Sequence, residues 1–254
     1  MASGERQGPG GIQVLVRATE ILRLLHGHHS GLTQSEIGEH LGLARSTVSR
    51  LLIALEAEGL VASTGPRGRY RLGPEIARLA GSARRNAWAD LHPLLVDFSY
   101  QVAETVDLSI LERDRAVFVD QVIAGNRLRA VSGVGESFPL HACANGKALL
   151  AAVPEQDRHR LIGGRLERYT DRTITSSAAL RREIEAVLQA GVAYDHEELT
   201  EGVCAIGASL GTIDGELLAI SIPVPAQRFA EREPELRAAL REFVERVNDW
   251  LAQR

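Results

Sequence analysis

The sequence predicts an α+β protein with two domains: an N-terminal winged helix-turn-helix, and a C-terminal domain whose antiparallel sheet is covered by helices. Three observations lead to this prediction. Residues 31–60 have the pattern of two helices separated by a tight turn. Residues 60–72 have the pattern of a strand, a turn and a returning strand. Beyond residue 104, strand-like hairpins alternate with helices, which is typical of a sheet with helices packed on it. The 254 residues are enough for two such domains.

Capping residues and apolar spacing define the first two helices. Residues 12–27 form an amphipathic pattern, which would supply the third helix that a two-helix motif needs to bury its apolar side. The next helix begins with a capping box, in which the Thr33 hydroxyl and the Glu36 carboxylate each satisfy a backbone N–H. Gly42 then ends this helix. The apolar face of the first pattern comprises Val14, Ala18, Ile21, Leu22 and Leu25.

The second helix of the motif, residues 44–58, has an apolar side and a polar side. Gly59 is expected to end it in the left-handed conformation. The buried stripe consists of Val48, Leu51, Leu52 and Leu55. The side predicted to contact DNA carries Arg45, Ser46, Thr47, Ser49 and Arg50. A purely structural helical hairpin with a solvated polar face would show the same pattern, so the residues that follow decide between the two.

The strand, turn and strand at residues 60–72 predict a basic wing. Strand alternation places Arg69 and Arg71 on one face of the returning strand. Arg67 lies in the turn, and Arg67 and Arg69 are predicted to contact the phosphate backbone. A helix-turn-helix followed by a wing in this order favours DNA binding over a structural hairpin.

The charge distribution agrees with this assignment. Residues 1–85 contain eleven arginines and seven glutamates but neither lysine nor aspartate, which gives this part four net positive charges. Because the whole chain has a net charge of −4, the remainder carries eight net negative charges. A basic first third with an acidic remainder indicates a DNA-binding module joined to a module of another kind.

Composition and proline placement indicate the domain boundaries. Residues 1–10, rich in glycine and polar side chains, are expected to be a disordered leader, and residues 11–73 form the winged helix-turn-helix. Pro74 suits the first turn of a helix, so residues 74–86 are predicted to be a linker helix. Residues 87–254 form the second domain. Its expected helices are 88–104, 143–153, 155–162, 176–190 and 233–251, and its expected strands are 105–112, 116–123, 128–131, 192–196, 205–210 and 216–222.

Several protein classes are not expected. No apolar run reaches the roughly 18 residues of a membrane span, and the N-terminus lacks the pattern of a signal peptide. The two cysteines, Cys143 and Cys204, form neither a disulfide framework nor a metal-binding spacing. We therefore expect a soluble cytoplasmic protein with no membrane partner, cofactor, metal site or catalytic residues.

Three short motifs suggest chemistry and are rejected on their pattern. The glycine before Lys147 resembles part of a P-loop, but His141 replaces the first glycine of that motif. Lys147, the only lysine, is expected on a helix surface because lysine is rarely buried; the alternative is contact with an acidic residue near a pocket. Residues 195–198, Asp-His-Glu-Glu, suggest a metal site, but strand neighbours point to opposite faces. Cys143 near His141 lacks an orienting third group for nucleophilic catalysis.

With these motifs in view, the chain resembles the IclR family of bacterial transcriptional regulators over nearly its full length. The N-terminal match is GLTQSEIGEHLGLARSTVSRLLIALEAEGLV followed by GRYRLG, and the C-terminal matches are FPLHACANGKALLA, AYDHEELTEGVCAIGASL and DGELLAISIPVP. The resemblance implies a GAF-like effector-binding domain after the linker helix. It also implies a homodimer or tetramer that binds double-stranded operator DNA and responds to a small-molecule effector, often a carboxylic acid or an aromatic compound.

The resemblance further implies where an effector binds. The matching positions are Ala144, Asn145, Asp195, Ala205, Ser221 and Pro223. Backbone N–H groups at the start of a helix would favour a carboxylate there. This chain departs from the family at three of these positions: many members have cysteine at Ala205, a hydroxyl residue at Pro223 and a small residue at Asn145. Its own Cys204 is one position earlier than the family cysteine and is expected to face the other side of the strand.

Two functions therefore stay open. The first is a transcriptional regulator in which an effector shifts the population of states and so alters, through the linker helices, the spacing of paired DNA readers. The second is a small-molecule sensor or enzyme whose winged helix serves protein contacts. The charge split and the wing arginines favour the first.

Overall fold

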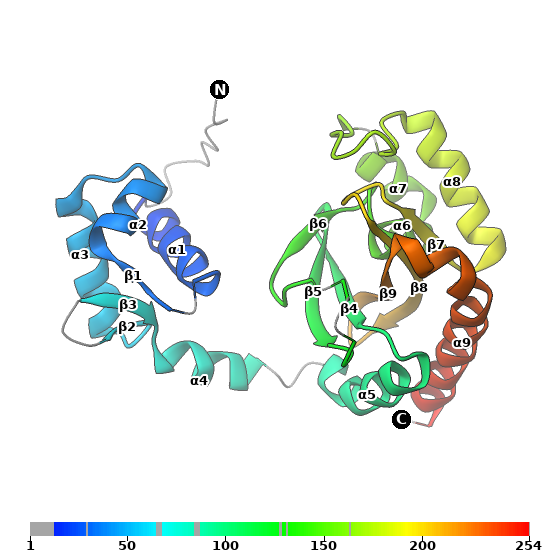
Figure 1. Cartoon of the computed structure of the whole chain (residues 1–254), viewed down its shortest axis with the longest axis horizontal. Coiled ribbons are helices and arrows are strands. Elements are labelled where there is room, and N and C mark those ends of the chain that lie inside the picture. Colours follow the sequence, from blue (N-terminus) through cyan, green and yellow to red (C-terminus); the bar gives the residue numbers. More distant parts are fainter. Residues whose placement is uncertain are drawn as a thin grey trace. The chain divides into compact units, whose positions relative to one another are not determined.

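In this computed structural model the chain divides into two compact units, residues 1–85 and 86–254, each of which is described by itself (Figure 1). The residues described are 13–28, 30–64, 68–83, 87–126, 129–130, 132–162 and 164–253. The predicted leader, residues 1–10, lies outside them. Within the described ranges, no helix has both the length and the apolar character to cross a membrane.

Unit 1 consists of three helices followed by a wing and a further helix. Its elements are α1 (Gln13–His26), β1 (Leu32–Thr33), α2 (Gln34–Leu41), α3 (Arg45–Ala57), β2 (Val61–Thr64), β3 (Arg69–Leu72) and α4 (Pro74–Ala83). The predicted helix-turn-helix and both wing strands are confirmed. The short strand β1 was not predicted; it pairs with β3, so that the sheet has the order β1-β3-β2.

The core of unit 1 is formed by α1, α2, α3 and the wing. Ile21 of α1, Ile37 of α2 and Val48 of α3 are fully buried together. The predicted apolar stripe of α3 is buried along its whole length. Val14, expected on the buried face of α1, is 52% exposed. That expectation is wrong because α1 packs against the core only from its second turn onward.

Two sequence signals set the helix ends in unit 1. The Glu36 backbone N–H donates to Thr33 Oγ1 at 3.3 Å, and the Thr33 N–H donates to Glu36 Oε2 at 2.6 Å. The predicted capping box is thus confirmed. Gly59 has a φ of +68°, which confirms the left-handed end of α3. Gly73 lies against this turn, and a Cβ at Gly73 would be 2.1 Å from the Gly59 carbonyl oxygen. Only glycine fits at position 73.

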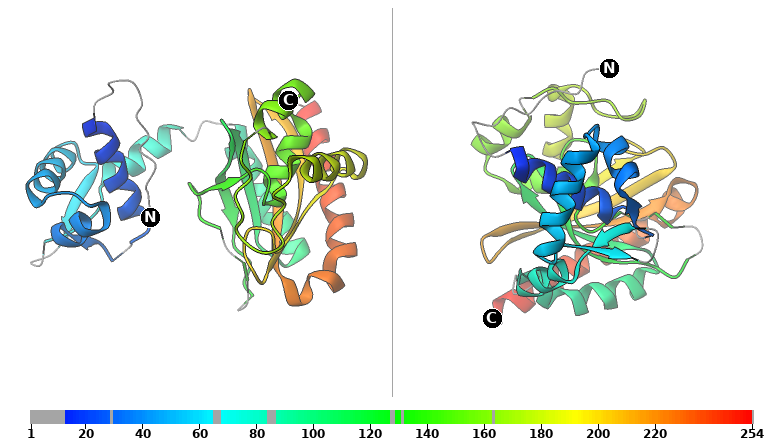
Figure 2. Two further views of the ribbon diagram at one scale, coloured as in Figure 1. Left: turned by 90° about the horizontal axis from the view of Figure 1, so that it is seen from above. Right: turned by 90° about the vertical axis from the view of Figure 1, so that its left-hand side faces the viewer.

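Unit 2 is a six-stranded antiparallel sheet between two layers of helices, which confirms the predicted fold class (Figure 2). Its helices are η1 (Ala87–Leu91, a 3-10 helix), α5 (His92–Val102), α6 (Ala144–Ala152), α7 (Glu155–Ile162), α8 (Ser177–Ala190) and α9 (Ala226–Ala252). Its strands are β4 (Val106–Glu112), β5 (Arg115–Val122), β6 (Ser137–Pro139), β7 (Ala193–His196), β8 (Val203–Ile213) and β9 (Glu216–Pro225). The strand order is β6-β5-β4-β9-β8-β7.

Side-chain alternation separates the two faces of this sheet. On one face, α5 and α9 pack over an apolar core, where Phe98 and Phe243 stack with ring centroids 4.3 Å apart. On the other face lie α6, α7 and α8. In β8, Cys204 belongs to the core under α9, whereas Ala205 lines a cavity on the α6 side. The expectation that Cys204 and Ala205 face opposite sides is confirmed.

Several elements of unit 2 differ from the predictions. Helix α9 begins at Ala226 and contains Pro234, whereas the predicted helix begins at residue 233. Strand β8 extends further than predicted at both of its ends, and β9 begins where predicted but ends three residues later. The strand expected at residues 128–131 is not formed at 129–130, and its outer residues lie outside the described ranges. The edge strand β6 was not predicted.

Candidate functional site

The exposed side of α3 presents the residues predicted to contact DNA. Arg45, Ser46 and Arg50 are exposed, and Thr47 and Ser49 are half-buried. Ile53, at the far end of the same side, is 64% exposed. An apolar side chain in that place is suited to a thymine methyl group. The Gln34 side chain donates to the Arg45 carbonyl oxygen at 2.8 Å and so ties the start of α3 to α2.

Arg69 has partners inside unit 1. Its Nε and Nη2 atoms donate to the Gly31 carbonyl oxygen at 3.1 and 2.9 Å, and Nη2 lies 3.3 Å from Glu36 Oε2. Hydrogen bonds from Thr33, more than the nearby guanidinium, lower the pKa of Glu36. Glu36 therefore caps α2 and also holds the wing. The geometry gives Arg69 a part in positioning the wing, and its predicted phosphate contact stays a prediction.

Of the other two wing arginines, Arg71 is within the described residues and Arg67 is not. Arg71 is exposed on β3, and β-strand alternation puts it on the same face as Arg69. Arg67, predicted to contact phosphate, lies outside the described residues. Of the two wing arginines within the described residues, Arg71 is the more exposed.

Unit 2 contains a cavity of about 140 Å³ between the start of α6 and the sheet. All six positions implied for the effector line this one cavity: Ala144, Asn145, Asp195, Ala205, Ser221 and Pro223. The remaining lining residues are Asp107, Phe118, Ala130, Ser132, Phe138, Cys143, Leu199, Thr200 and Val203. The sheet register explains part of this grouping, since Ala205 lies opposite both Pro223 and Asp195 on neighbouring strands.

Asp107 on β4 is a cavity residue that the sequence analysis missed. Its side chain is 1% exposed; Gln121 donates to Oδ1 at 2.6 Å and Ser132 donates to Oδ2 at 2.9 Å. Burial raises the pKa of Asp107 to about 6, although both hydrogen bonds act to lower it. The sequence did contain a signal, because Asp107 and Ser109 alternate with apolar residues in the predicted strand 105–112.

Asp195 on β7 is the second buried carboxyl of the cavity. It is 5% exposed, and the Glu198 backbone N–H donates to Asp195 Oδ1 at 2.7 Å. Burial raises the pKa of Asp195 to about 7. The Glu198 carboxylate acts in the same direction, whereas the Glu198 backbone hydrogen bond and the Lys147 charge act against it.

This raised pKa makes the stability of unit 2 depend on pH. The unfolded carboxyl has a pKa of about 3.9, so the folded protein holds this proton more tightly. Stability from the protonated group is fully present below pH 4 and is lost as the pH rises through about 7. Asp195→Asn removes the titration, so at pH 8 the variant is expected to be more stable than the wild type by about 1–3 kcal/mol. Thermal unfolding at pH 5 and pH 8 measures this; an advantage that does not grow with pH contradicts it.

Cys143 forms part of the structure at the start of α6. Its Sγ atom accepts from the Gly146 backbone N–H and donates to the Pro139 carbonyl oxygen, both at 3.3 Å. Burial raises the pKa of the Cys143 thiol to about 12, which keeps it protonated at neutral pH. The His141 ring contacts the Glu167 carbonyl oxygen at 2.9 Å. The cysteine and histidine therefore have separate structural roles.

Lys147 does not lie on the helix surface, and that expectation is wrong. Its side chain is fully buried, and its Nζ atom lies 2.7 Å from Glu198 Oε1 and 3.1 Å from Glu183 Oε1. The alternative, contact with an acidic residue near the pocket, is the one the structure bears out, because Glu198 also bonds to Asp195. The two glutamates come from α8 and from the loop after β7, positions that sequence spacing does not bring together.

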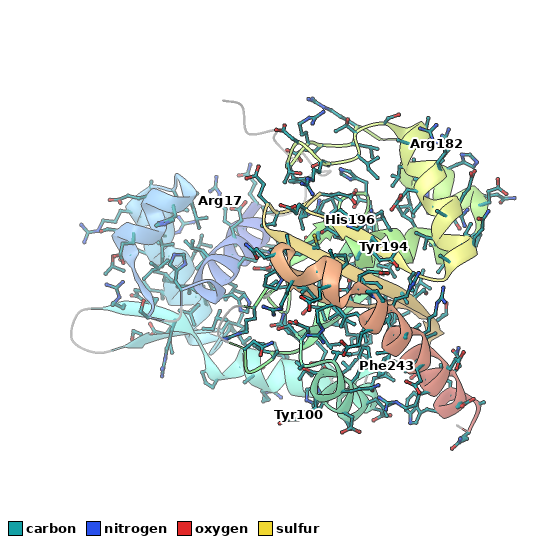
Figure 3. All side chains as sticks on the ribbon, turned by 45° about the vertical axis from the view of Figure 1, so that its right-hand side comes forward. Arg17, Tyr100, Arg182, Tyr194, His196 and Phe243 are labelled. Carbon is teal, nitrogen blue, oxygen red and sulfur yellow. The ribbon has the colours of Figure 1, made fainter. Side chains whose placement is uncertain are left out.

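Residues 195–198 do not converge on one point. Asp195 faces the cavity, whereas His196 stacks on Tyr194 with ring centroids 5.4 Å apart on the α9 side (Figure 3). Glu197 pairs with Arg172 at 2.8 Å. Over the described ranges, no group of three or more histidine, cysteine or acidic side chains is placed to hold a metal ion.

Comparisons with known sequences match both units. The sequence model for the IclR helix-turn-helix domain matches residues 14–65, and the model for the C-terminal domain of the bacterial transcriptional regulator IclR matches residues 83–249. The HTH-type transcriptional regulator Rv1719 of Mycobacterium tuberculosis is 58% identical, over 95% of this chain and 93% of its own. The HTH-type transcriptional regulator TtgV of Pseudomonas putida is 36% identical, over 91% of this chain and 88% of its own.

Solved structures agree with these matches. The crystal structure of an IclR transcriptional regulator from Alicyclobacillus acidocaldarius superposes with a TM-score of 0.79 at 28% identity, over 94% of this chain and 98% of that chain. The relatives named above are transcriptional regulators and not enzymes, which agrees with the prediction of a non-enzymatic protein.

Proposed function

Since the chain belongs to the IclR family of bacterial transcriptional regulators, we propose that it binds operator DNA through α3 and the wing, under the control of a small molecule in the cavity of unit 2. The protein acts in the cytoplasm as a homodimer or tetramer, because paired readers match the two halves of a symmetric operator. The observation that carries the effector part is the grouping of all six implied positions around one cavity.

The mechanism we propose is a population shift. The effector binds one state of the protein better than another and so changes the fraction that is able to hold operator DNA. The factor by which the effector changes the affinity for DNA equals the factor by which DNA changes the affinity for the effector. Titrating the effector with and without operator DNA therefore tests the mechanism, and identical effector affinities in the two titrations would exclude it.

Arg50→Ala is expected to weaken operator binding by about 1–3 kcal/mol if Arg50 contacts a base edge. Fluorescence anisotropy on the upstream DNA of the protein's own gene measures this. Arg182→Ala, which removes an exposed arginine from α8 in unit 2, is the matched control and should leave the affinity unchanged. An unaltered affinity in Arg50→Ala would remove Arg50 from the interface.

A second measurement tests whether the winged helix binds DNA or instead contacts another protein. The logarithm of the DNA association constant should fall with the logarithm of salt concentration, with a slope of about −0.9 for each phosphate neutralised. If the folded protein fails to retard its upstream DNA at low salt, the winged helix serves protein contacts and the proposal fails.

The cavity is tested by filling it. Ala205→Leu places a larger side chain on the cavity wall, at an expected stability cost of about 1–3 kcal/mol. Operator binding should persist, whereas compounds that raise the melting temperature of the wild type should no longer do so. A variant that still responds to those compounds would place the effector elsewhere.

A further inference from the structure

We propose that the cavity selects an uncharged or positively charged molecule of single-ring size, with hydroxyl or amino groups that donate to Asp107 and Asp195, and that it rejects carboxylates. This inference rests on the proposed function, because it assigns a ligand class to the same cavity. It departs from the carboxylate that the start of α6 suggested, and the reasons are the placement of the two aspartates and the charges around them.

The two aspartates stand at opposite ends of the cavity. Asp107 lies on β4 and Asp195 on β7, and β9 and β8 separate these strands. Asp107 lies opposite Ser221 of β9, and Asp195 lies opposite Ala205 of β8. With neighbouring strands about 4.8 Å apart, the backbones of β4 and β7 are roughly 14 Å apart along the sheet. A ligand that reaches both side chains therefore needs one donor group at each end.

The charges around the cavity exclude an anion. Among the described residues that line it, none is a lysine or an arginine. The nearby Lys147 ammonium is fully buried and pairs with Glu183 and Glu198, so these two carboxylates already balance its charge. Among the described residues, the groups that donate hydrogen bonds to Asp107 and Asp195 are uncharged. At pH 8, above the raised pKa values of both aspartates, a ligand carboxylate would add a third negative charge to a buried site. A hydroxyl or an ammonium instead supplies the donors that buried carboxylates need.

The start of α6 offers little compensation to an anion. The Gly146 N–H is capped by Cys143 Sγ, and the Lys147 N–H donates to the Cys143 carbonyl oxygen. The Asn145 side chain is directed to Ser109, where Nδ2 donates to Oγ at 2.6 Å. The backbone N–H groups of Ala144 and Asn145, which line the cavity, have no partner among the described residues and can face a ligand. A helix start carries only about half a positive charge, which is less than the charge of the two carboxylates, so the aspartates set the charge preference of the cavity.

The size and the walls of the cavity define the body of the ligand. Its volume of about 140 Å³ is close to the roughly 150 Å³ of an engineered cavity that binds benzene. Phe118 and Phe138 line the cavity with ring centroids 4.7 Å apart. An aromatic ring fits this wall, and its substituents supply the donors.

Three compounds that share a phenol ring test the inference on the full-length protein by isothermal titration calorimetry at pH 8. They are 4-hydroxybenzyl alcohol, 4-hydroxybenzylamine and 4-hydroxybenzoate, which differ only in the second group. The alcohol and the amine should bind at least about 30-fold more tightly than the carboxylate, because like charges repel strongly in a buried site. Asp107→Asn should narrow this gap at least about tenfold by admitting the carboxylate. Asp249→Asn, an exposed α9 residue, should leave it unchanged, and a native melting curve confirms that each variant is folded.

The results that would contradict the ligand class differ from the result that would contradict the proposed function. Tightest binding of the carboxylate would overturn the selectivity while leaving the cavity as the effector site. An Asp107→Asn variant with the wild-type ranking would overturn the role of Asp107. If none of the three binds at millimolar concentration, the ligand class is wrong, whereas retardation of operator DNA, measured without any compound, still decides the proposed function.

Discussion

Lys147→Met is expected to destabilise unit 2 by about 3–5 kcal/mol, the usual cost of removing one partner from a buried ion pair. Lys147 is fully buried, and it is the cation within 2.7 Å of Glu198 and 3.1 Å of Glu183. The second oxygen of Glu198, Oε2, is buried and has no hydrogen-bond partner among the described residues. Without the ammonium, Glu198 would keep an uncompensated charge in a buried site.

Chemical denaturation of the variants measures this effect. The double variant Lys147→Met with Glu198→Gln should recover much of the loss, because it removes the buried carboxylate together with its partner. Arg160→Met is the matched control, since Arg160 pairs with Asp157 on an exposed face of α7; its effect should stay below about 1 kcal/mol. A loss of less than about 1 kcal/mol in Lys147→Met would show that the buried pair contributes little.

Gly73→Ala is expected to cost unit 1 at least about 3 kcal/mol, because the added Cβ overlaps backbone that has no room to move. The Cβ would lie 2.1 Å from the Gly59 carbonyl oxygen and 2.9 Å from the Val61 nitrogen. The Gly73 N–H also donates to the Leu60 carbonyl oxygen at 2.8 Å. The clash therefore separates the end of β3 from the turn after α3, which holds the wing beside the recognition helix.

Because the chain forms two compact units, the effect of this variant on unit 1 can be measured against unit 2 as an internal reference. Hydrogen exchange should show lost protection in α3 and the wing, and operator binding should fall, while the melting of unit 2 stays unchanged. Gly27→Ala is the control in unit 1, because the nearest atom to its Cβ is Leu24 O at 3.8 Å. Wild-type operator affinity in Gly73→Ala would contradict the proposed fit between these two turns.

The features that were predicted correctly are those that neighbouring residues determine. Apolar spacing gave the buried stripe of α3, and the capping box at Thr33 gave the start of α2, because both depend on residues within a few positions of each other. The alternation that placed Cys204 and Ala205 on opposite faces is equally local. The longer start of α9 was missed because Pro234 resembles a helix start when the preceding residues are read alone.

The features that were missed depend on residues distant in the sequence. Lys147 is buried because Glu183 and Glu198 reach it from elsewhere in the chain. Arg69 is held by the Gly31 carbonyl oxygen, 38 residues earlier. Asp107 enters the cavity wall because β4 pairs with β9, whose residues lie more than 100 positions away. Each of these roles requires the pairing of elements, which periodicity and spacing do not specify.

The division of tasks within unit 1 has a consequence for how such a protein diverges. Glu36 and Arg69 join α2 to the wing, whereas the exposed Arg45, Ser46 and Arg50 make no side-chain hydrogen bond or ion pair within the described part of the chain. Substitutions at these three positions therefore cost little stability, since exposed residues without structural partners usually change it by less than about 0.5 kcal/mol. After gene duplication, a copy of this protein is free to acquire a new operator preference by changing these side chains, while the scaffold that presents them stays fixed.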